Sequence, residues 1–388
     1  MDNISILSLL LQEQIKDFRS KHGQRYKLYK LLTISILAML SGADDYEAMA
    51  AFAEARQSYL KANNLLENEN LPSHDLFRWI FMRLDKDSFS SFLGILLEQM
   101  IEQTKLEQSE PLLVSDQKRI HIDGKSLRAT RTSEHSRTAL QIVNAYCSDT
   151  RLSLGQLIID GKSCEKTAIP QLIDLLDLKN AIVTIDAIAT SKKNALAITV
   201  KHGDYILALK KNNKLLWQEV DSFFKNFKGT KLISDFSQTI DKAHGRIEQR
   251  TCHIISQLQY FPDAEGWSKL KSLICIESQR TTKNKVTNET RYYLTSLAPN
   301  APQLLSEVRR HWSVENELHW SLDVSFNEDK SKVKDKNAAF NLSTLRRFCL
   351  AIIKNMKISK HSVKTQRLQS AWNEQFLNRF FDFLQKTY

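Results

Sequence analysis

Two aspartates stand where a carboxylate beside a hydrophobic core could do chemistry. Asp123 ends the segment RIHID and Asp186 ends the segment AIVTID, and both segments are typical of buried strands. A carboxylate in such a place normally caps a turn, pairs with a basic residue or binds a cation. A turn explains either aspartate taken alone. Two of them on strands that become neighbours favour a shared cation site.

A third acidic candidate, Glu315, lies in the segment HWSVENELHW. On a helix, polar and metal-capable groups recur every four residues and share one stripe, at His311, Glu315, His319 and Asp323. An apolar strip beside this stripe would hold the helix against a sheet, at Val314, Leu318 and Leu322. The alternative is a surface helix held by salt bridges, with Trp312 and Trp320 packed for stability. Oxygen ligands around an open cleft suit Mg²⁺ better than a transition metal.

The elements that must position these acids alternate in type from residue 118 onwards. Short β-branched runs and amphipathic runs follow the order strand, strand, strand, helix, strand, helix, strand, over residues 118–128, 139–148, 152–160, 164–176, 181–189, 191–203 and 204–210. Three sequential strands followed by strands alternating with helices predict a mixed sheet. This is the layout of a ribonuclease H-like α/β domain.

The flanking regions predict two further parts. The first hundred residues have helical periodicity, and the polar stretch TKLEQSEP places a domain boundary near Ser115. We therefore expect an N-terminal helical domain over residues 1–115 and a catalytic domain over residues 116–388. Within the second domain, period-two segments predict a β-rich insertion at about 231–298, and helical patterns return from Pro302 to a basic C-terminus.

Charge and composition narrow the function classes. The chain carries 55 Lys and Arg against 44 Asp and Glu, a net charge of +11. From Lys330 onwards there are 13 basic and 3 acidic residues, so almost all of the excess lies in this segment. A polyanion such as DNA is the natural partner of such a segment, and a solvated Lys-rich surface is the equal alternative.

Cysteine spacing and hydropathy argue against a zinc-binding, disulfide-linked, membrane or secreted protein. The five cysteines form no closely spaced pair, which disfavours a zinc knuckle or a disulfide framework. The apolar stretch from Leu31 to Leu40 is too short to cross a bilayer, and the N-terminus lacks a basic region before its apolar run. We therefore expect a cytoplasmic protein, associated with the nucleoid and not with a membrane.

Seven strings, in this order, resemble the H-repeat-associated insertion-sequence transposases of the DDE superfamily: HIDGKSLR, GQLIIDGKSCEKTAIPQLIDLLDL, IVTIDAIATSKKNA, DYILALKKN, HGRIEQR, RYYLTSL and VRRHWSVENELHWSLDVSFNED. The N-terminal segments LLTISILAMLSGADDYEAMAAFAEA and LPSHDLFRWIFMRLD resemble the domain associated with that family. The resemblance implies a ribonuclease H-like catalytic core with its metal-binding triad at Asp123, Asp186 and Glu315.

The resemblance also implies a reaction and its partners. A transposase of this kind binds the ends of its own element, cleaves the DNA backbone and transfers strands with two Mg²⁺ ions, for which Mn²⁺ can substitute. Synapsis of two ends implies a homodimer on the DNA. We expect DNA contacts from residues near the triad and in the insertion, namely Lys125, Lys210, Arg246, Arg310, His311, Trp312 and His319.

Each expected DNA contact has a plain structural alternative. Lys125 and Lys210 are also explained as surface lysines, and Arg246 as the partner of Glu248 at a strand end. Core packing is the favoured explanation for the tryptophans. Two other functions also remain: a catalytically silent DNA-binding protein derived from a transposase, and a ribonuclease H-like nuclease that hydrolyses without joining strands.

Overall fold

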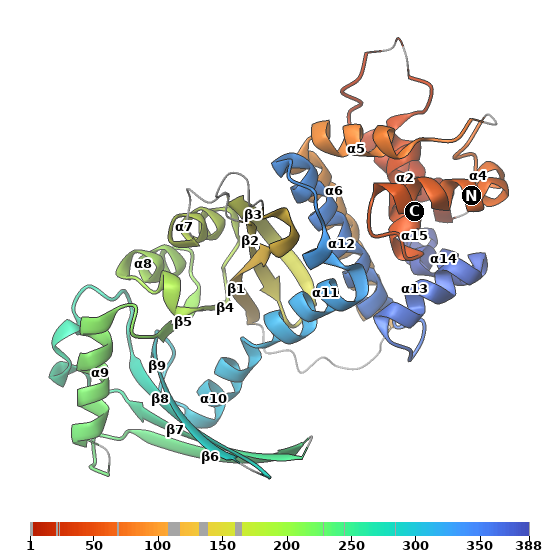
Figure 1. The fold of residues 1–388 in the computed structure, drawn as a ribbon. Helices are drawn as coiled ribbons and strands as arrows, with labels where there is room; N and C mark the ends of the chain where they lie inside the picture. The colour runs from red at the N-terminus through yellow and green to blue at the C-terminus, as the bar shows by residue number, and fades with distance from the viewer. Residues whose placement is uncertain are drawn as a thin grey trace.

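A computed structural model of the chain describes residues 3–20, 22, 24–67, 70–107, 117–131, 139–159, 165–227, 229–243, 245–283 and 285–387. The molecule is elongated, with a large sheet at one end and a group of helices at the other (Figure 1). The predicted boundary near Ser115 lies outside the described residues. The first strand begins at Lys118, which fits a change of architecture close to that point.

Within the described residues, nine strands form one sheet in the order β3-β2-β1-β4-β5-β9-β8-β7-β6. Strand β1 pairs antiparallel with β2 and parallel with β4, and β4 pairs parallel with β5. This is the predicted ribonuclease H-like mixed sheet. The strands are β1 (Lys118–Leu127), β2 (Leu140–Cys147), β3 (Leu152–Ile159), β4 (Ala181–Ile185), β5 (Asp204–Leu209), β6 (Asp235–Ala243), β7 (Arg246–Ile255), β8 (Ser272–Thr282) and β9 (Lys285–Thr295).

Helices cover both faces of the sheet, which explains why every residue of β4 is buried. One face packs against α7 (Glu165–Leu175), α8 (Lys192–Val200) and α9 (Lys214–Phe227). The other face packs against α10 (Ala301–Arg310), the π-helical segment Val314–His319, α11 (Trp320–Phe326) and α12 (Lys336–Met356).

The β-rich insertion extends the central sheet. Antiparallel pairing of β5 with β9 makes β6 to β9 a direct continuation of the ribonuclease H-like strands (Figure 1). The predicted segment 238–255 divides into β6 and β7, and Gly245 takes a positive φ of 71° where the chain reverses.

Two predictions about the elements at the site were wrong: the placement of Asp123 at the end of its strand and the continuous helix over 301–326. Strand β1 continues to Leu127, so Asp123 lies within the strand, paired with Asn144, and not at its end. The predicted helix over 301–326 is interrupted after Arg310 and continues through the π-helical segment. By contrast, β4 ends at Ile185, so Asp186 directly follows its strand as predicted.

The helical end of the molecule is built from both ends of the sequence. Its N-terminal part contains α1 (Asn3–Gln14), α2 (Leu28–Leu40), α3 (Tyr46–Ala55), α4 (Gln57–Ala62), α5 (His74–Arg83) and α6 (Lys86–Glu107). These helices share one hydrophobic core with α12 and with α13 (Val363–Trp372), α14 (Glu374–Asn378) and α15 (Asp382–Thr387). The C-terminal helices, expected within the catalytic domain, therefore complete the helical unit, although α12 also touches β3.

No helix in the described part of the chain combines the length and the apolar character needed to cross a bilayer.

Candidate active site

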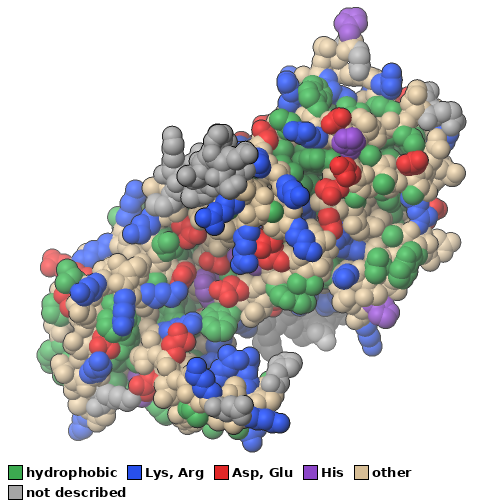
Figure 2. Space-filling model, in the orientation of Figure 1, with side chains coloured by type: hydrophobic (Ala, Val, Ile, Leu, Met, Phe, Trp, Pro, Cys, Tyr) green, Lys and Arg blue, Asp and Glu red, His purple; other side chains and the backbone are tan. Residues whose placement is uncertain are grey.

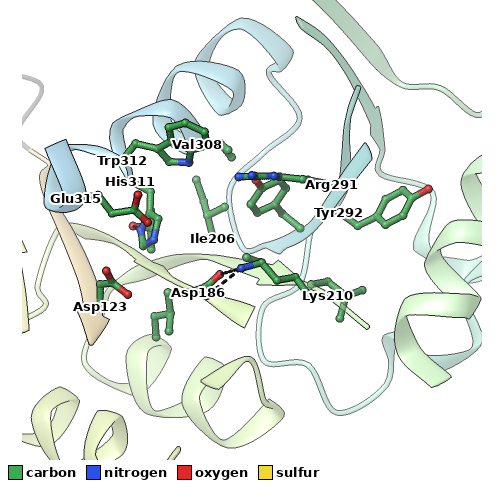
Figure 3. A pocket seen from close by; sticks show the side chains of 15 residues that line it. Asp123, Asp186, Ile206, Lys210, Arg291, Tyr292, Val308, His311, Trp312 and Glu315 are labelled. Carbon is green, nitrogen blue, oxygen red and sulfur yellow. Dashed lines mark hydrogen bonds and ion pairs between the residues drawn. The ribbon is translucent and has the colours of Figure 1, made fainter. Parts of the chain in front are cut away.

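The three predicted acids line one cavity of about 200 Å³ in the middle of the sheet. Asp123 comes from β1, Asp186 follows β4, and Glu315 lies on the π-helical segment above them (Figure 3). Three elements far apart in the sequence thus bring carboxylates to one place. The predicted triad is spatially coherent.

Alternation along β1 determines which side chains face the cavity. Ile120 and Ile122 belong to the core under α7, so His121, Asp123 and Lys125 face the opposite side. On that side they meet the predicted polar stripe in order. His121 packs edge-on against His311 at 5.8 Å between ring centroids, Asp123 lies 3.7 Å from His319, and Lys125 binds Asp323. The stripe therefore runs along β1 and faces the site.

Asp123 is a buried carboxyl with an unusual acidity. Burial, and to a smaller extent the negative charges of Glu315, Asp186 and Glu165, raise its pKa to about 7. His319 gives little compensation, since burial lowers the pKa of its ring to about 3 and leaves it neutral. The site thus holds more negative charge than its own side chains neutralise.

Asp186 differs from Asp123 because a lysine accompanies it. Lys210 donates to both carboxylate oxygens, at 2.9 and 3.0 Å (Figure 3). Although burial opposes ionisation, the hydrogen bond and charge of Lys210 lower the pKa of Asp186 overall. Lys210 was predicted at a strand end near the site, and it follows β5 there.

The acids provide oxygen donors of the kind that Mg²⁺ prefers. Among the residues that the structure describes, however, no three His, Cys, Asp or Glu side chains are gathered closely enough to hold a metal ion as they stand. Lys210 forms an ion pair with Asp186, and burial together with the neighbouring carboxylates raises the pKa of Asp123. The donor chemistry fits a cation, and Lys210 is the group that would compete with it for Asp186.

Lys125, which was expected to reach DNA, is buried and engaged in ion pairs in the structure described. Only 8% of its side chain is exposed, and its ammonium group binds Asp323 and, at 2.9 Å, the fully buried Glu328. Lys125 follows Asp123 by two residues and lies on the same face of β1, where its side chain extends towards α11 and the interior. Lys125 is a structural ion-pair residue.

The two other basic candidates lie outside the cavity. Arg246 begins β7 and forms an ion pair with Glu248 at 3.2 Å, which was the alternative considered for it. Arg310 ends α10, pairs with Asp149 at 3.3 Å and lines a neighbouring groove. Neither is brought to the carboxylates.

The two tryptophans beside the polar stripe are more exposed than expected. Trp312 is 45% exposed and Trp320 is 60% exposed, so the core packing favoured for them is wrong. Trp312 lines both the acidic cavity and the neighbouring groove, and Arg291 lies over its ring at 5.1 Å. His311 lines the cavity beside Glu315 (Figure 3).

Glu165 is an acid next to the site that sequence reasoning did not select. A side chain at Gly124 would place its Cβ 2.2 Å from the Glu165 carboxylate, so the glycine makes room for it beside Asp123. Burial, followed by the charge of Asp186, raises the pKa of Glu165. Its position within the string GQLIIDGKSCEKTAIP was the available signal. Arg291 and Thr184 also line the cavity, and no spacing rule points to them.

The surface around this region mixes both signs of charge. Figure 2 shows acidic side chains near the middle of the molecule with Lys and Arg side chains around them. Part of the basic excess after Lys330 is internal, because Arg346, Arg347 and Arg367 are buried. Arg347 binds Glu328 and Arg367 binds Asp44, each at 2.8 Å. Lys330, Lys332 and Lys334 are exposed, as a DNA-facing segment requires.

The strand order and the acidic cavity above β1 and β4 define a ribonuclease H-like domain. The chain belongs to the DDE transposase family: residues 115–353 match the model of the transposase DDE domain, and residues 11–95 match that of the DDE_Tnp_1-associated domain.

Curated relatives agree over nearly the whole length. "Putative transposase YncI" of Escherichia coli O157:H7 is 33% identical over 95% of this chain and 93% of its own. "H repeat-associated putative transposase YhhI" of Escherichia coli K12 is 31% identical over 97% of this chain and 96% of its own. A solved piggyBac transposase synaptic complex with hairpin DNA aligns with 99% of this chain and 78% of its own, at 12% identity and TM-score 0.41, too distant for any functional argument.

Proposed function

We propose that this protein is an active transposase that binds the ends of an insertion element, cleaves the DNA backbone there and transfers the freed strands. The observation that carries the proposal is the convergence of Asp123, Asp186 and Glu315 on one cavity, with the pKa of Asp123 raised to about 7 by burial and by the neighbouring carboxylates. Such unneutralised charge suits a site that takes up cations together with a phosphate.

Asp123, Asp186 and Glu315 would hold two Mg²⁺ ions, or Mn²⁺ as a substitute, which activate an oxygen nucleophile and neutralise charge on the scissile phosphate. The protein's own contribution is positioning. Lys210 is half-exposed, so once it releases Asp186 its ammonium group can bind a phosphate oxygen at the same edge of the sheet. Arg291 and Trp312 line the same cavity and would contact the DNA backbone and an unstacked base.

Strand transfer separates this proposal from simple hydrolysis. Joining needs the cleaved 3′-OH to stay in the site and attack a second phosphate, so two ends and two protomers should assemble on the DNA. We therefore include a homodimeric DNA complex in the proposal. A catalytically silent derivative would keep DNA binding and lose both reactions.

The test uses the full chain and linear duplexes taken from DNA on each side of its coding sequence. Mg²⁺-dependent nicks at the boundary of an inverted repeat, together with products joined to a plasmid, are expected. Scrambled duplexes are the matched control. Nicks without joined products would identify a nuclease, and binding without nicks in Mg²⁺ or Mn²⁺ would refute catalysis.

A further inference from the structure

A chain of hydrogen-bonded side chains connects the acidic cavity to the neighbouring groove. His311 Nδ1 lies 2.7 Å from Thr184 Oγ1, which lies 2.7 Å from His121 Nδ1. His121 Nε2 lies 3.0 Å from Ser148 Oγ. His311 lines the cavity, Ser148 lines the groove, and Thr184 and His121 are buried between them.

The number of available protons makes the tautomers of His311 and His121 depend on each other. His121 is fully buried and its two ring nitrogens hydrogen-bond to the hydroxyls of Thr184 and Ser148, so its ring is held neutral. Burial also lowers the pKa of His311 to about 4, so this ring is neutral near pH 7 as well. A neutral imidazole carries one N–H, and a threonine hydroxyl donates one hydrogen bond. Thr184 lies between two Nδ1 atoms, so it donates to one of them and accepts from the other. The two histidines must therefore be opposite tautomers.

The surroundings of His311 determine the direction in which the hydrogen bonds are donated along this chain of side chains. Its Nε2 is on the side of the ring opposite Thr184, and the cavity that the ring lines is bounded by Asp123, Asp186 and Glu315. Carboxylates, like phosphate oxygens, accept hydrogen bonds, so an N–H at Nε2 is favoured over a lone pair. His311 Nδ1 then accepts from Thr184, which accepts from His121 Nδ1–H, whose Nε2 accepts from Ser148. All donors point towards the cavity, and such chains reinforce one another.

We propose that His311 is a catalytic residue that presents a neutral Nε2–H donor to the scissile phosphate, and that Thr184, His121 and Ser148 are positioning residues that fix this tautomer. The phosphate is the substrate group of the proposed transposase reaction, so this part of the inference rests on that function. The donor adds no charge to the site. It stabilises charge that develops on a phosphate oxygen without competing with cations for the carboxylates.

The tautomer is tested without DNA or metal. The full chain is labelled with ¹⁵N-histidine, and two-bond ¹H–¹⁵N correlations show which ring nitrogen carries the proton. The His311 signal is assigned by its absence in His311→Gln. The expected result is an Nε2–H tautomer that becomes a mixture in Thr184→Val and is restored in Thr184→Ser. An Nδ1–H tautomer of His311 in the wild type would overturn the inference.

The catalytic role is tested on end-containing duplexes in Mg²⁺. His311→Ala should slow cleavage by about 100-fold, the usual effect of losing one oxyanion donor. His311→Gln keeps an N–H near the position of Nε2 and should be closer to the wild type. Thr184→Val should slow cleavage by about tenfold, and Thr184→Ser, which keeps the hydroxyl, should recover most of the loss.

Two outcomes distinguish failure of the inference from failure of the proposed function. Wild-type cleavage rates in His311→Ala, measured with active enzyme, would remove His311 from the reaction. A wild-type protein that never cleaves would refute the proposed function and with it the catalytic role of His311, while the spectra alone would still confirm or refute the tautomer chain.

Discussion

Asp123 lies on the face of β1 whose Lys125 binds Glu328. The pKa values of these two carboxyl groups are nevertheless shifted in opposite directions. Burial, together with the charges of the neighbouring carboxylates, raises the pKa of Asp123 to about 7. Burial also opposes ionisation of Glu328, but Arg347 and Lys125 hold its pKa well below the usual range. Lys125, two residues from Asp123 along β1, contributes to this stabilisation.

The contrast separates two uses of buried charge. Around Glu328 every charge has a partner, as expected of a group that joins α12 to the sheet. Among the described residues, the carboxyl of Asp123 has no ion pair with a lysine or an arginine, which is unfavourable for folding and is typical of a functional site. Neutralising each carboxylate should therefore have opposite consequences for stability and activity.

The largest effect is expected from the acidic cavity. Asp123→Asn, Asp186→Asn and Glu315→Gln should each reduce Mg²⁺-dependent cleavage of end DNA by more than about 1,000-fold, because each removes a carboxylate proposed to hold the ions. DNA affinity, measured by fluorescence anisotropy, should change little. Asp323→Asn is the matched control on the same helical stripe and should retain measurable activity. An active Glu315→Gln with an inactive Asp323→Asn would show that the third acid is misassigned.

The largest loss of stability is expected when Glu328 is replaced. Glu328→Gln leaves Lys125 and Arg347 buried with an uncharged partner and should lower the free energy of unfolding by about 3–5 kcal/mol. Urea denaturation followed by circular dichroism measures this change. Asp123→Asn is the comparison, and it should leave stability unchanged or raise it. Equal losses in both variants would show that the two carboxylates do not differ as described.

Asp123 and Glu328 should also contribute to the pH dependence of stability with opposite signs. In metal-free buffer the folded state holds a proton on Asp123 up to about pH 7, whereas an unfolded aspartate releases it near pH 3.9. The folded state thus binds more protons between these values, and this group makes stability fall as pH rises through that window. Glu328, whose pKa is lowered, contributes stability that is present above about pH 4.5 and is lost at lower pH.

Unfolding free energies measured between pH 5 and 8 test this sign. Asp123→Asn should remove the fall with rising pH and should gain most over the wild type at pH 8. A wild-type slope that persists in Asp123→Asn would assign it to another group.

The smallest effect is expected at the basic segment. Replacing Lys330, Lys332, Lys334 and Lys336 together with Gln should weaken binding to end and random duplexes about equally, by roughly tenfold at moderate salt, because phosphate contacts carry no sequence information. The slope of log affinity against log salt should flatten by up to about 3. An unchanged slope would show that these lysines are solvated surface.

The sequence predicted most elements because hydrophobic periodicity reports burial directly. The strands of the ribonuclease H-like core and the polar stripe of His311, Glu315, His319 and Asp323 follow from patterns of two and four residues. The family resemblance then selected the acids among many candidates.

Other features depend on contacts that no local pattern encodes. Lys125 meets Glu328 across 203 residues, and its burial is visible only once β1 and α11 are packed together. Pairing of β5 with β9 makes the insertion part of the sheet, and period-two segments carry no information about their partner. Glu165 reaches the site because Gly124 has no side chain, a fact of packing.

The core that α1 to α6 share with α12 to α15 also determines the order in which parts of the chain can fold during synthesis. The first helices leave the ribosome well before the segments that cover their apolar faces, and the whole sheet is made in between. The helical unit can reach its native packing only when α12 and the helices after it have been synthesised, while the sheet can form earlier. Premature termination before Lys336 would release a chain with exposed apolar helices, prone to aggregation and open to proteolysis.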